Sequence, residues 1–182
     1  MNSAEKDELR YKLKVKRRYM GEIVRLEADR AILEEFIQSF SNYKSFFIYN
    51  GFSTEARTDM IISYLLESGK RVYLPRVEGR EIVAVPYFGG ECPLGAYGIA
   101  EPCGEPFSGD IEVTVIPLLA VNGRGYRIGY GGGFYDRYLK GKNTLKVGMG
   151  YGFQMEEFKE EPFDVPLDKY LCERGIYDFV GK

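Results

Sequence analysis

Short apolar segments that stop at proline, glycine or Asn-Gly alternate along this chain with longer segments of helical periodicity. The apolar segments predict strands at 45–49, 71–74, 81–85, 112–116, 145–149 and 176–179. Helical patterns lie over 4–40, after Ser53 and over 133–139. Strands that alternate with helices are typical of an α/β sandwich with a mostly parallel sheet. That is the fold we expect.

Local signals predict where these elements end. Gly21 interrupts the N-terminal helical pattern, and an apolar stripe follows at Ile32, Leu33, Phe36, Ile37 and Phe40. We expect Ser53 to cap the next helix and Gly69 to end it. Pro75 and Pro86 are expected to end two of the strands, because proline cannot donate a ladder hydrogen bond.

The residue types that are present limit the chemistry. The chain has 182 residues and no histidine. Its length suits a single domain over 1–182, and the missing histidine excludes Ser-His and Cys-His pairs and a histidine base. Its three cysteines, Cys92, Cys103 and Cys172, form no Cys-x-x-Cys unit. Catalysis must then rely on Lys, Arg, acids, Tyr, main-chain amides or a hard cation, which favours phosphate chemistry.

The charge and hydropathy of the chain limit the kinds of partner that it can bind. The formal net charge is −2, which argues against a nucleic-acid-binding protein, although residues 1–30 are locally basic. No apolar run approaches the roughly 18 residues that span a bilayer, and the N-terminus shows no signal-peptide pattern. We expect a cytoplasmic protein with neither a membrane nor a nucleic-acid partner.

The most informative local pattern is the segment 127–139, which reads RIGYGGGFYDRYL. Glycines between a strand and a helix let the main chain turn several N–H groups toward one point, which makes an anion site. Each such bond to a charged phosphate oxygen is worth roughly 1.5–3 kcal/mol. The segment is not a Walker loop or a dinucleotide fingerprint. The alternative is a flexible turn whose aromatic residues belong to the core.

Asp136 lies in the first turns of the helix after this glycine-rich segment. A carboxylate beside a phosphate requires a cation between them, and magnesium takes one or two carboxylates together with phosphate oxygens. Asp164 and Asp168 are candidates for the second carboxylate. The alternative is a favourable charge at a helix start and two surface acids.

A basic face in the N-terminal helix is a second candidate for phosphate contact. It is formed by Lys6, Arg10, Lys14 and Arg17, at helical spacing. Lys6 and Arg10 are placed to clamp a polyphosphate, although a solvated helix face is the common meaning of such a run. Glu55 is a partner for ligand N–H groups or a first-turn charge.

These motifs make the chain similar to the 5-formyltetrahydrofolate cyclo-ligases, also called 5,10-methenyltetrahydrofolate synthetases, over nearly its whole length. The segment 127–136 is similar to the family signature almost residue for residue. Lys6 with Leu9-Arg10 resembles the ATP-contacting start, and Glu55-Ala-Arg-Thr58 resembles the folate-contacting Glu-x-x-Thr. Further landmarks are Leu74-Pro75-Arg76, Gly98 to Pro102, Gln154 after Tyr151, and Asp164 to Asp168.

The resemblance implies a three-layer α/β/α domain, with residues 1–40 as a helical segment packed on the core, and it implies site residues. ATP would be contacted by Lys6, Arg10, Arg127, Ile128, Gly129, Tyr130, Gly131, Gly132, Gly133, Phe134 and Tyr135. The folate would be contacted by Asn50, Glu55, Tyr130, Gly131, Gly132, Gly133 and Phe134. Lys6, Arg10 and Tyr151 would serve catalysis, and Asp136 and Asp168 would hold magnesium.

The implied activity is the Mg²⁺- and ATP-dependent closure of 5-formyltetrahydrofolate to 5,10-methenyltetrahydrofolate, by a monomer or weak homodimer. Two alternatives remain: a related ATP-dependent ligase or kinase for another small acid, and a nucleotide-binding regulator without catalysis. A nucleic-acid-binding module is disfavoured by the net charge. Two residues depart from the family pattern, Asn122 in place of Asp and Phe163 in place of His. They put the fine tuning of substrate binding in doubt.

Overall fold

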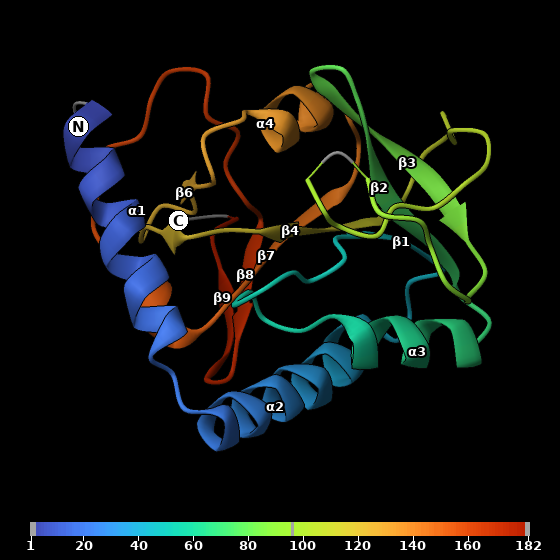
Figure 1. Cartoon of the computed structure of the whole chain (residues 1–182), viewed down its shortest axis with the longest axis horizontal. Coiled ribbons are helices and arrows are strands. Elements are labelled where there is room, and N and C mark those ends of the chain that lie inside the picture. Colours follow the sequence, from blue (N-terminus) through green and yellow to red (C-terminus); the bar gives the residue numbers. More distant parts are fainter. Residues whose placement is uncertain (1–2, 96, 181–182) are drawn as a thin grey trace.

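The computed structural model describes residues 3–95 and 97–180. Its centre is a seven-stranded sheet in the order β3-β2-β1-β4-β7-β8-β9 (Figure 1). Strands β2, β1, β4, β7 and β8 run parallel, whereas β3 and β9 pair antiparallel at the two edges. The bounds are β1 (Ser45–Ile48), β2 (Arg71–Glu78), β3 (Glu81–Tyr87), β4 (Val113–Pro117), β7 (Leu145–Met149), β8 (Lys169–Cys172) and β9 (Gly175–Asp178). The predicted α/β fold with a mostly parallel sheet is confirmed.

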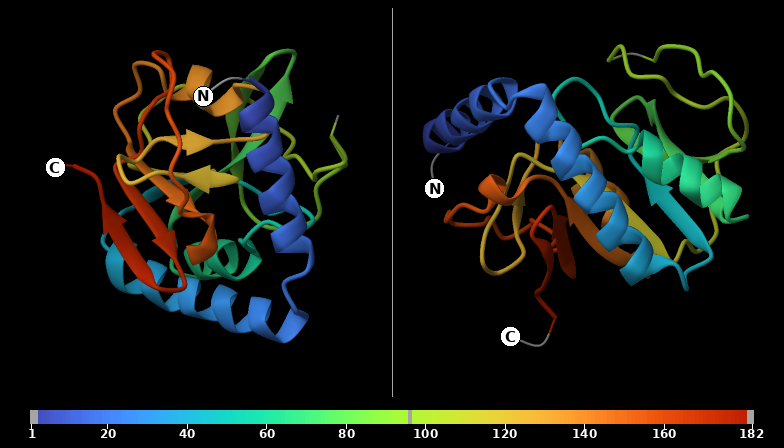
Figure 2. Two further views of the ribbon diagram at one scale, coloured as in Figure 1. Left: turned by 90° about the vertical axis from the view of Figure 1, so that its left-hand side faces the viewer. Right: turned by 90° about the horizontal axis from the view of Figure 1, so that it is seen from below.

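Helices cover both faces of the sheet, as the three-layer arrangement requires. α2 (Glu22–Phe40) and α3 (Asp59–Glu67) lie on one face, and α4 (Phe134–Leu139) lies on the other (Figures 1 and 2). Phe36, in the apolar stripe of α2, packs on the first face in one buried cluster with Val113. On the opposite face, the rings of Phe47 and Tyr138 have centroids 4.6 Å apart.

The N-terminal helix α1 (Ser3–Arg18) lies at the side of these layers, near a small sheet of β5 (Ala120–Val121) and β6 (Arg127–Ile128) (Figure 2). Leu13 of α1 is fully buried in a cluster with Ala120, Ile128 and Phe158. The predicted interruption at Gly21 separates α1 from α2. No described helix is both long and apolar enough to cross a membrane.

Two strands continue through the prolines that were expected to end them. β2 and β3 form a long antiparallel pair in which Pro75 lies opposite Ala84 and Pro86 lies opposite Tyr73. β1 pairs with β2 only as far as Tyr73. On the side of Pro75 that faces away from β3 there is therefore no neighbouring strand among the described residues, and the missing N–H of proline costs no hydrogen bond on that side. Pro86 lies on the edge strand, where proline is tolerated.

Other differences are local. Ser53 does not cap α3, because the helix begins at Asp59 with Thr58 at its N-cap position. Residues 51–57 form a loop instead. Strand β8, the short β5–β6 pair and the 3₁₀ helix η1 (Gly152–Gln154) were not predicted. They carry two to four residues each, which is too short for a periodic signal.

Candidate functional site

The sheet has a topological switch point at β1. From β1 the chain passes through α3 to β2 on one side, and β4 pairs with the other side of β1. In open α/β sheets, ligands bind outside the carboxyl ends of strands at such a point. Asn50 follows β1 there, Leu118 follows β4, and Tyr151 follows β7.

The glycine-rich loop, residues 129–133, uses its carbonyl groups and not its N–H groups within the protein. Arg10 Nε donates to the carbonyl of Gly129 at 3.0 Å, and Arg137 Nη2 donates to the carbonyl of Gly132 at 2.9 Å. The carbonyl of Gly133 accepts from the N–H of Arg137 at 3.1 Å. Among the described residues, no acceptor receives a hydrogen bond from an N–H group of residues 129–133. The loop therefore keeps its donors for an external acceptor.

Two glycines of this loop have backbone angles that other residues rarely adopt. The φ angle of Gly131 is +100° and that of Gly133 is +66°. A side-chain carbon on Gly131 would lie 3.9 Å from the guanidinium of Arg10, and one on Gly133 would lie 2.6 Å from Arg137 Nη1. The loop thus lies against two arginines, in a backbone conformation that requires glycine at these two positions.

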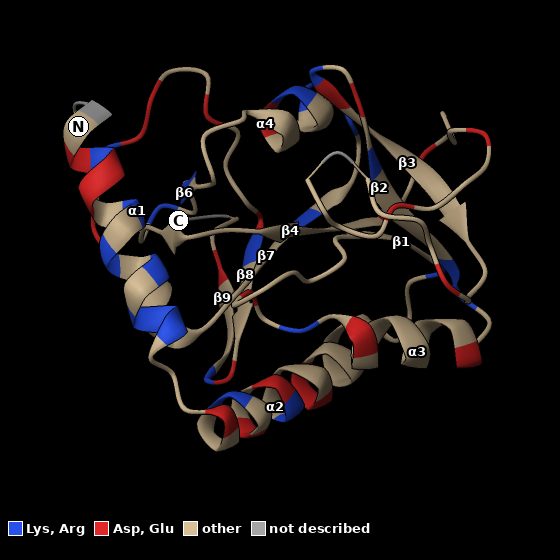
Figure 3. Ribbon diagram, in the orientation of Figure 1, with Lys and Arg blue, Asp and Glu red and all other residues tan. Residues whose placement is uncertain are grey.

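The basic face of α1 meets the loop at Tyr130. Arg17 Nη2 donates to the Tyr130 hydroxyl at 2.8 Å, and Arg17 Nη1 lies 3.5 Å from the carbonyl of Leu118. Arg17 is buried, and its Nε has no hydrogen-bond partner among the described residues. Lys14 Nζ lies 5.6 Å from the centre of the Tyr130 ring. Figure 3 shows lysines and arginines along α1. The face is therefore partly structural and not simply solvated.

Lys6 and Arg10 differ in their distance from the loop. Arg10 contacts the Gly129 carbonyl directly and also pairs with Asp7 at 2.6 Å. Lys6 Nζ pairs with Glu161 at 2.6 Å, and no contact from Lys6 to the glycine loop is present among the described residues. The structure thus brings Arg10 to the loop and places Lys6 beside the segment that follows β7.

Glu55 lies in the 51–57 loop and faces the glycine loop. Its Oε2 accepts from the N–H of Phe52 at 2.9 Å. Burial raises the pKa of the Glu55 carboxyl, while the Tyr130 hydroxyl, as a hydrogen-bond donor, and the charges of Arg17 and Arg25 oppose that rise in pKa. Glu55 and Tyr130 therefore lie together, as the predicted folate site requires.

A cavity of about 330 Å³ opens beside this loop. Its lining consists of Arg25, Asn50, Gly51, Ser53, Arg57, Thr58 and Asp59. Asn50 Nδ2 donates to the carbonyl of Ala100 at 3.2 Å, so the segment after β3 reaches this edge of the sheet. In the same segment the ring of Tyr97 meets that of Phe134 edge-on, with centroids 6.0 Å apart.

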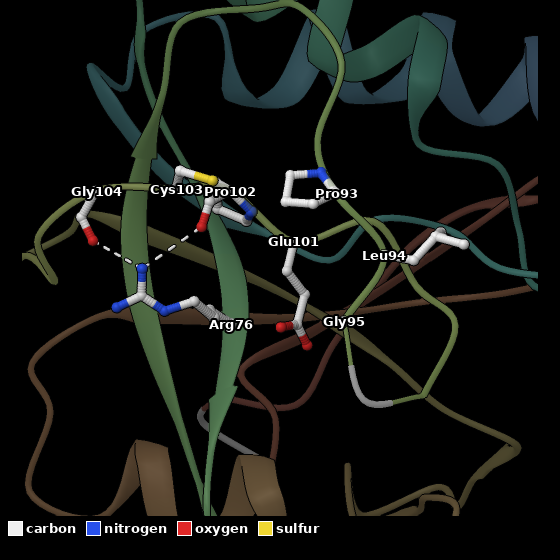
Figure 4. A pocket seen from close by; sticks show the side chains of 8 residues that line it. All are labelled: Arg76, Pro93, Leu94, Gly95, Glu101, Pro102, Cys103 and Gly104. Carbon is white, nitrogen blue, oxygen red and sulfur yellow. Dashed lines mark hydrogen bonds between the residues drawn. The ribbon is translucent and has the colours of Figure 1, made fainter.

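A second cavity, of about 260 Å³, lies between this segment and β2 (Figure 4). Arg76 Nη1 donates to the carbonyl of Gly104 at 2.7 Å, and the N–H of Val77 donates to Glu101 at 3.2 Å. A side-chain carbon on Gly95 would lie 2.1 Å from the Glu101 carboxyl carbon. The family landmarks Arg76 and Glu101 thus anchor the segment to the sheet.

The two predicted metal ligands have different partners. Asp136 Oδ1 accepts from Arg127 Nη2 at 2.8 Å and from the N–H of Val165 at 3.2 Å. Asp168 Oδ2 accepts from the N–H of Lys146 at 2.7 Å and pairs with its Nζ at 2.9 Å. The described residues contain no cluster of three acidic or cysteine side chains fit for a metal ion. Each of the two carboxylates is therefore already paired with a basic side chain of the protein.

Three other predicted site residues pack in the interior of the protein. Ile128 is buried in the cluster with Leu13, and Tyr135 is half-buried, with its ring 6.3 Å from that of Phe47. Tyr151 is fully buried. The Tyr151 hydroxyl donates to Asp29 Oδ1 at 2.9 Å and accepts from Arg25 Nε at 3.1 Å.

Sequence reasoning did not identify Arg25 or Asp29 as site residues. Both lie on α2, where they share a face with Ile32 and Phe36 at helical spacing. A charged residue on an apolar stripe is the signal that was available, because charged side chains are rarely buried without a partner. Asp29 is 1% exposed.

The two departures from the family pattern have simple structural settings. Asn122 is buried, and its Oδ1 accepts from the N–H groups of Arg124 and Tyr126, both at 3.0 Å. An amide oxygen can therefore hold the turn between β5 and β6 in the way that a carboxylate oxygen would. Phe163 is 78% exposed. Among the described residues, neither forms a hydrogen bond or a ring contact with the glycine loop.

Comparisons with known proteins agree on one family. A sequence model of the 5-formyltetrahydrofolate cyclo-ligase family matches residues 2–173. The 5-formyltetrahydrofolate cyclo-ligase of Mycolicibacterium smegmatis is 30% identical, with 97% of this chain aligned to 98% of that protein. The cyclo-ligase of Mycoplasma genitalium is 49% identical over 65 residues, which cover 35% of this chain and 39% of that protein.

A solved structure shares the fold over nearly the whole chain. The 5,10-methenyltetrahydrofolate synthetase of Aquifex aeolicus superposes with a TM-score of 0.87 at 31% sequence identity. The superposition covers 97% of this chain and 94% of the Aquifex chain. The likeness therefore extends over nearly the whole fold.

Proposed function

Because the chain belongs to the 5-formyltetrahydrofolate cyclo-ligase family, we propose that it converts 5-formyltetrahydrofolate into 5,10-methenyltetrahydrofolate and uses ATP to do so. One observation supports this above all. In the loop of residues 129–133, the carbonyls of Gly129, Gly132 and Gly133 accept hydrogen bonds within the protein, whereas no N–H group of the loop donates one to a described residue. The loop lies at the end of β6 and beside the basic helix α1 (Figure 2). Such a loop suits a polyphosphate.

The nucleotide would bind between the glycine loop and α1. The N–H groups of residues 129–133 are the donors, and Arg10 brings a positive charge of α1 into contact with the loop. Arg127 is placed behind the loop, where it donates to the carbonyl of Val165 at 2.8 Å and to Asp136. In this proposal Arg127 fixes the start of α4, and Lys6 contributes a more distant positive charge.

The fit to magnesium rests on Asp136. Both of its hydrogen bonds reach Oδ1, so Oδ2 remains for a cation, and the side chain is 36% exposed. One carboxylate with phosphate oxygens is a common way to hold magnesium, which would offset the charge of the transferred phosphoryl group. The assignment of Asp168 as a second ligand stays a prediction.

The folate would occupy the crevice beside Asn50 and Glu55. The Glu55 carboxylate is the acceptor for pterin N–H groups, and the cavity lined by Asn50 and Ser53 lies next to it. Phe134 and Tyr97 provide aromatic surface at the other side of the crevice. These contacts orient the formyl group toward the glycine loop.

The reaction follows from that arrangement. The oxygen of a formamide is a poor leaving group, so attack by N10 of the folate on the formyl carbon stalls. Transfer of the γ-phosphoryl group of ATP to this oxygen gives a phosphate ester and ADP. N10 then attacks the formyl carbon and loses its proton, and phosphate leaves as the carbon–oxygen bond breaks. The protein aligns the reactants and neutralises charge, which accounts for most catalysis of phosphoryl transfer.

The test is a direct assay. Purified protein is mixed with 5-formyltetrahydrofolate and magnesium-ATP, and the absorbance of the methenyl product is followed together with ADP release. We expect product only when ATP is present. Absence of product, or product without ATP, would contradict the proposal. Nucleotide binding without turnover would indicate the regulator, and ADP release with another small acid would indicate the related ligase or kinase.

Other properties remain predictions from sequence. We propose that the chain acts in the cytoplasm, as a monomer or weak homodimer, without a nucleic-acid or membrane partner. Sedimentation of the purified protein, with and without ligands, tests the predicted oligomeric state.

A further inference from the structure

We propose that Arg25 is a positioning residue for the folate site, which holds the loop that carries Glu55 and is itself oriented by the buried pair of Tyr151 and Asp29. This inference rests on the proposed function, because Glu55 is taken as the residue that binds the pterin. It gives a role to three polar groups at the carboxyl end of the sheet. Two of them, Arg25 and Asp29, lie outside every motif identified in the sequence.

Arg25 binds the main chain of the 51–57 loop. Arg25 Nη2 donates to the carbonyl of Glu55 at 2.6 Å and to the carbonyl of Ser53 at 2.9 Å. One nitrogen thus holds two main-chain oxygens on both sides of residue 54. A planar guanidinium with fixed donor directions suits this task better than a lysine amine.

The loop that Arg25 holds has an unusual backbone conformation at Ser53. Ser53 has a φ of +56° and is the one non-glycine residue with positive φ in the described parts of the chain. Such a conformation persists only where the surroundings enforce it. The N–H of Glu55 donates to the carbonyl of Phe52 at 3.1 Å, and the Glu55 carboxylate accepts from the N–H of Phe52. Arg25 therefore grips a tight turn, and the direction of this turn sets the direction of Glu55.

Arg25 is itself oriented by the buried hydroxyl of Tyr151. Its Nε donates to the Tyr151 hydroxyl at 3.1 Å, and that hydroxyl donates its own proton to Asp29 Oδ1 at 2.9 Å. With the proton directed at Asp29, the hydroxyl oxygen presents a lone pair to Arg25. Asp29 Oδ1 also accepts from the N–H of Arg57 at 3.2 Å, which fixes the far end of the same loop.

The carboxylate of Asp29, at the end of this chain of contacts, is buried. Asp29 is 1% exposed, and its Oδ2 has no hydrogen-bond partner among the described residues, although Arg57 Nε lies 3.7 Å away. Burial of a carboxylate costs free energy, so the presence of Asp29 here is not explained by a gain in the stability of the fold. A chain of three groups that spans α2, the end of β7 and the 51–57 loop is better explained by the geometry that it imposes on the site.

The experiment compares Arg25→Ala, Arg25→Lys and Tyr151→Phe in the methenyl-product assay, with separate titrations of folate and ATP. We expect Arg25→Ala to raise the KM for 5-formyltetrahydrofolate about tenfold or more, the loss typical of one charge-assisted hydrogen bond. The KM for ATP and the kcat should change less than about threefold, because positioning lost in the loop weakens substrate binding first. Arg25→Lys should recover only part of the affinity.

Tyr151→Phe keeps the buried ring and removes the hydroxyl, so it also serves if Arg25→Ala fails to fold. It should raise the same KM. In the double variant of Arg25→Ala and Tyr151→Phe, the rise in folate KM should be smaller than the product of the two single rises, because both residues act through one loop. Arg30→Ala, on the exposed face of the same helix, is the matched control and should leave both KM values unchanged.

The outcomes separate this inference from the proposed function. If wild-type protein makes no methenyl product, the proposed function fails. If the wild type is active and the folate KM of Arg25→Ala equals that of Arg30→Ala, the positioning role is wrong while the function stands. A fall in kcat without a rise in folate KM, or fully independent effects of Arg25→Ala and Tyr151→Phe, would also overturn it.

Discussion

The Tyr130 hydroxyl accepts a hydrogen bond from Arg17 Nη2 at 2.8 Å, so a tyrosine of the glycine loop rests on a buried guanidinium of the N-terminal helix. The same hydroxyl lies against Glu55 and lowers the pKa of that carboxyl, which burial raises. One side chain therefore contacts both the helix and the residue assigned to the folate. The nucleotide and folate sides of the crevice share this tyrosine.

Replacement of Tyr130 by Phe should shift the pH dependence of the reaction. Without the hydroxyl, the Glu55 pKa moves further above its ordinary value of 4.5. Folate binding by the ionised carboxylate falls as the pH drops through the Glu55 pKa, so the acidic limb of kcat/KM for folate should move to higher pH. Tyr138→Phe, on α4, is the matched control. If the acidic limb of the Tyr130→Phe profile lies at the same pH as that of the wild type, Glu55 is not the titrating group.

Replacement of Gly131 by Ala should weaken nucleotide binding. With φ at +100°, an alanine strains the loop and moves its N–H groups, so we expect the KM for ATP to rise about tenfold, the loss of roughly one such bond. Gly90→Ala is the control, because Gly90 has a φ of +95° and open space around it. Both variants should lose about 1 kcal/mol of stability. Equal ATP KM values in the two would contradict the nucleotide assignment.

Replacement of Asp136 by Asn should raise the magnesium concentration needed for half-maximal activity and lower kcat by at least about tenfold. The control is Asp178→Asn, which removes an exposed pair with Lys169 and should have little effect. A magnesium titration of product formation measures both. The same titration of Asp168→Asn tests the second predicted ligand, and an unchanged requirement would leave Asp168 as the partner of Lys146 only.

Replacement of Asp29 by Asn should change how stability depends on pH. Burial raises the pKa of the Asp29 carboxyl above its ordinary value of 3.8. The folded state then binds the proton more tightly than the unfolded state, so this group favours folding below pH 3.8 and loses that contribution as the pH rises through its folded pKa.

The asparagine variant lacks this titration. The stability of the variant relative to wild type should therefore increase as the pH rises from about 4 to about 7. The difference between their free energies of unfolding, measured by urea unfolding at each pH, tests this. A relative loss of stability at the higher pH would mean that the attraction of Arg25 and Arg57 outweighs the burial of the charge.

Sequence patterns predicted the sheet and the glycine loop because both depend on local signals. Apolar runs with proline or glycine at their ends gave β1, β4 and β7, and the glycines gave the turn before α4. Long-range contacts escaped prediction. β8 forms because β7 and β9 offer ladders on both sides, and its four residues carry no periodicity.

The site shows the same division. The segment 127–136 was identified by its spacing, and Arg10 by its helical face. The hydrogen bond between Arg25 and Tyr151 joins residues 126 positions apart, and nothing in either neighbourhood indicates it. The burial of Tyr151 likewise depends on how α2 packs over the end of β7, which a single sequence does not encode in any local pattern.

The use of carbonyls and not N–H groups in the 129–133 loop has a kinetic consequence. Two arginines fix the turn while the protein folds, so an arriving triphosphate does not have to order this segment. Association should then proceed at a rate set by diffusion and charge and should depend strongly on salt. Dissociation, and not loop closure, would limit how fast the nucleotide exchanges.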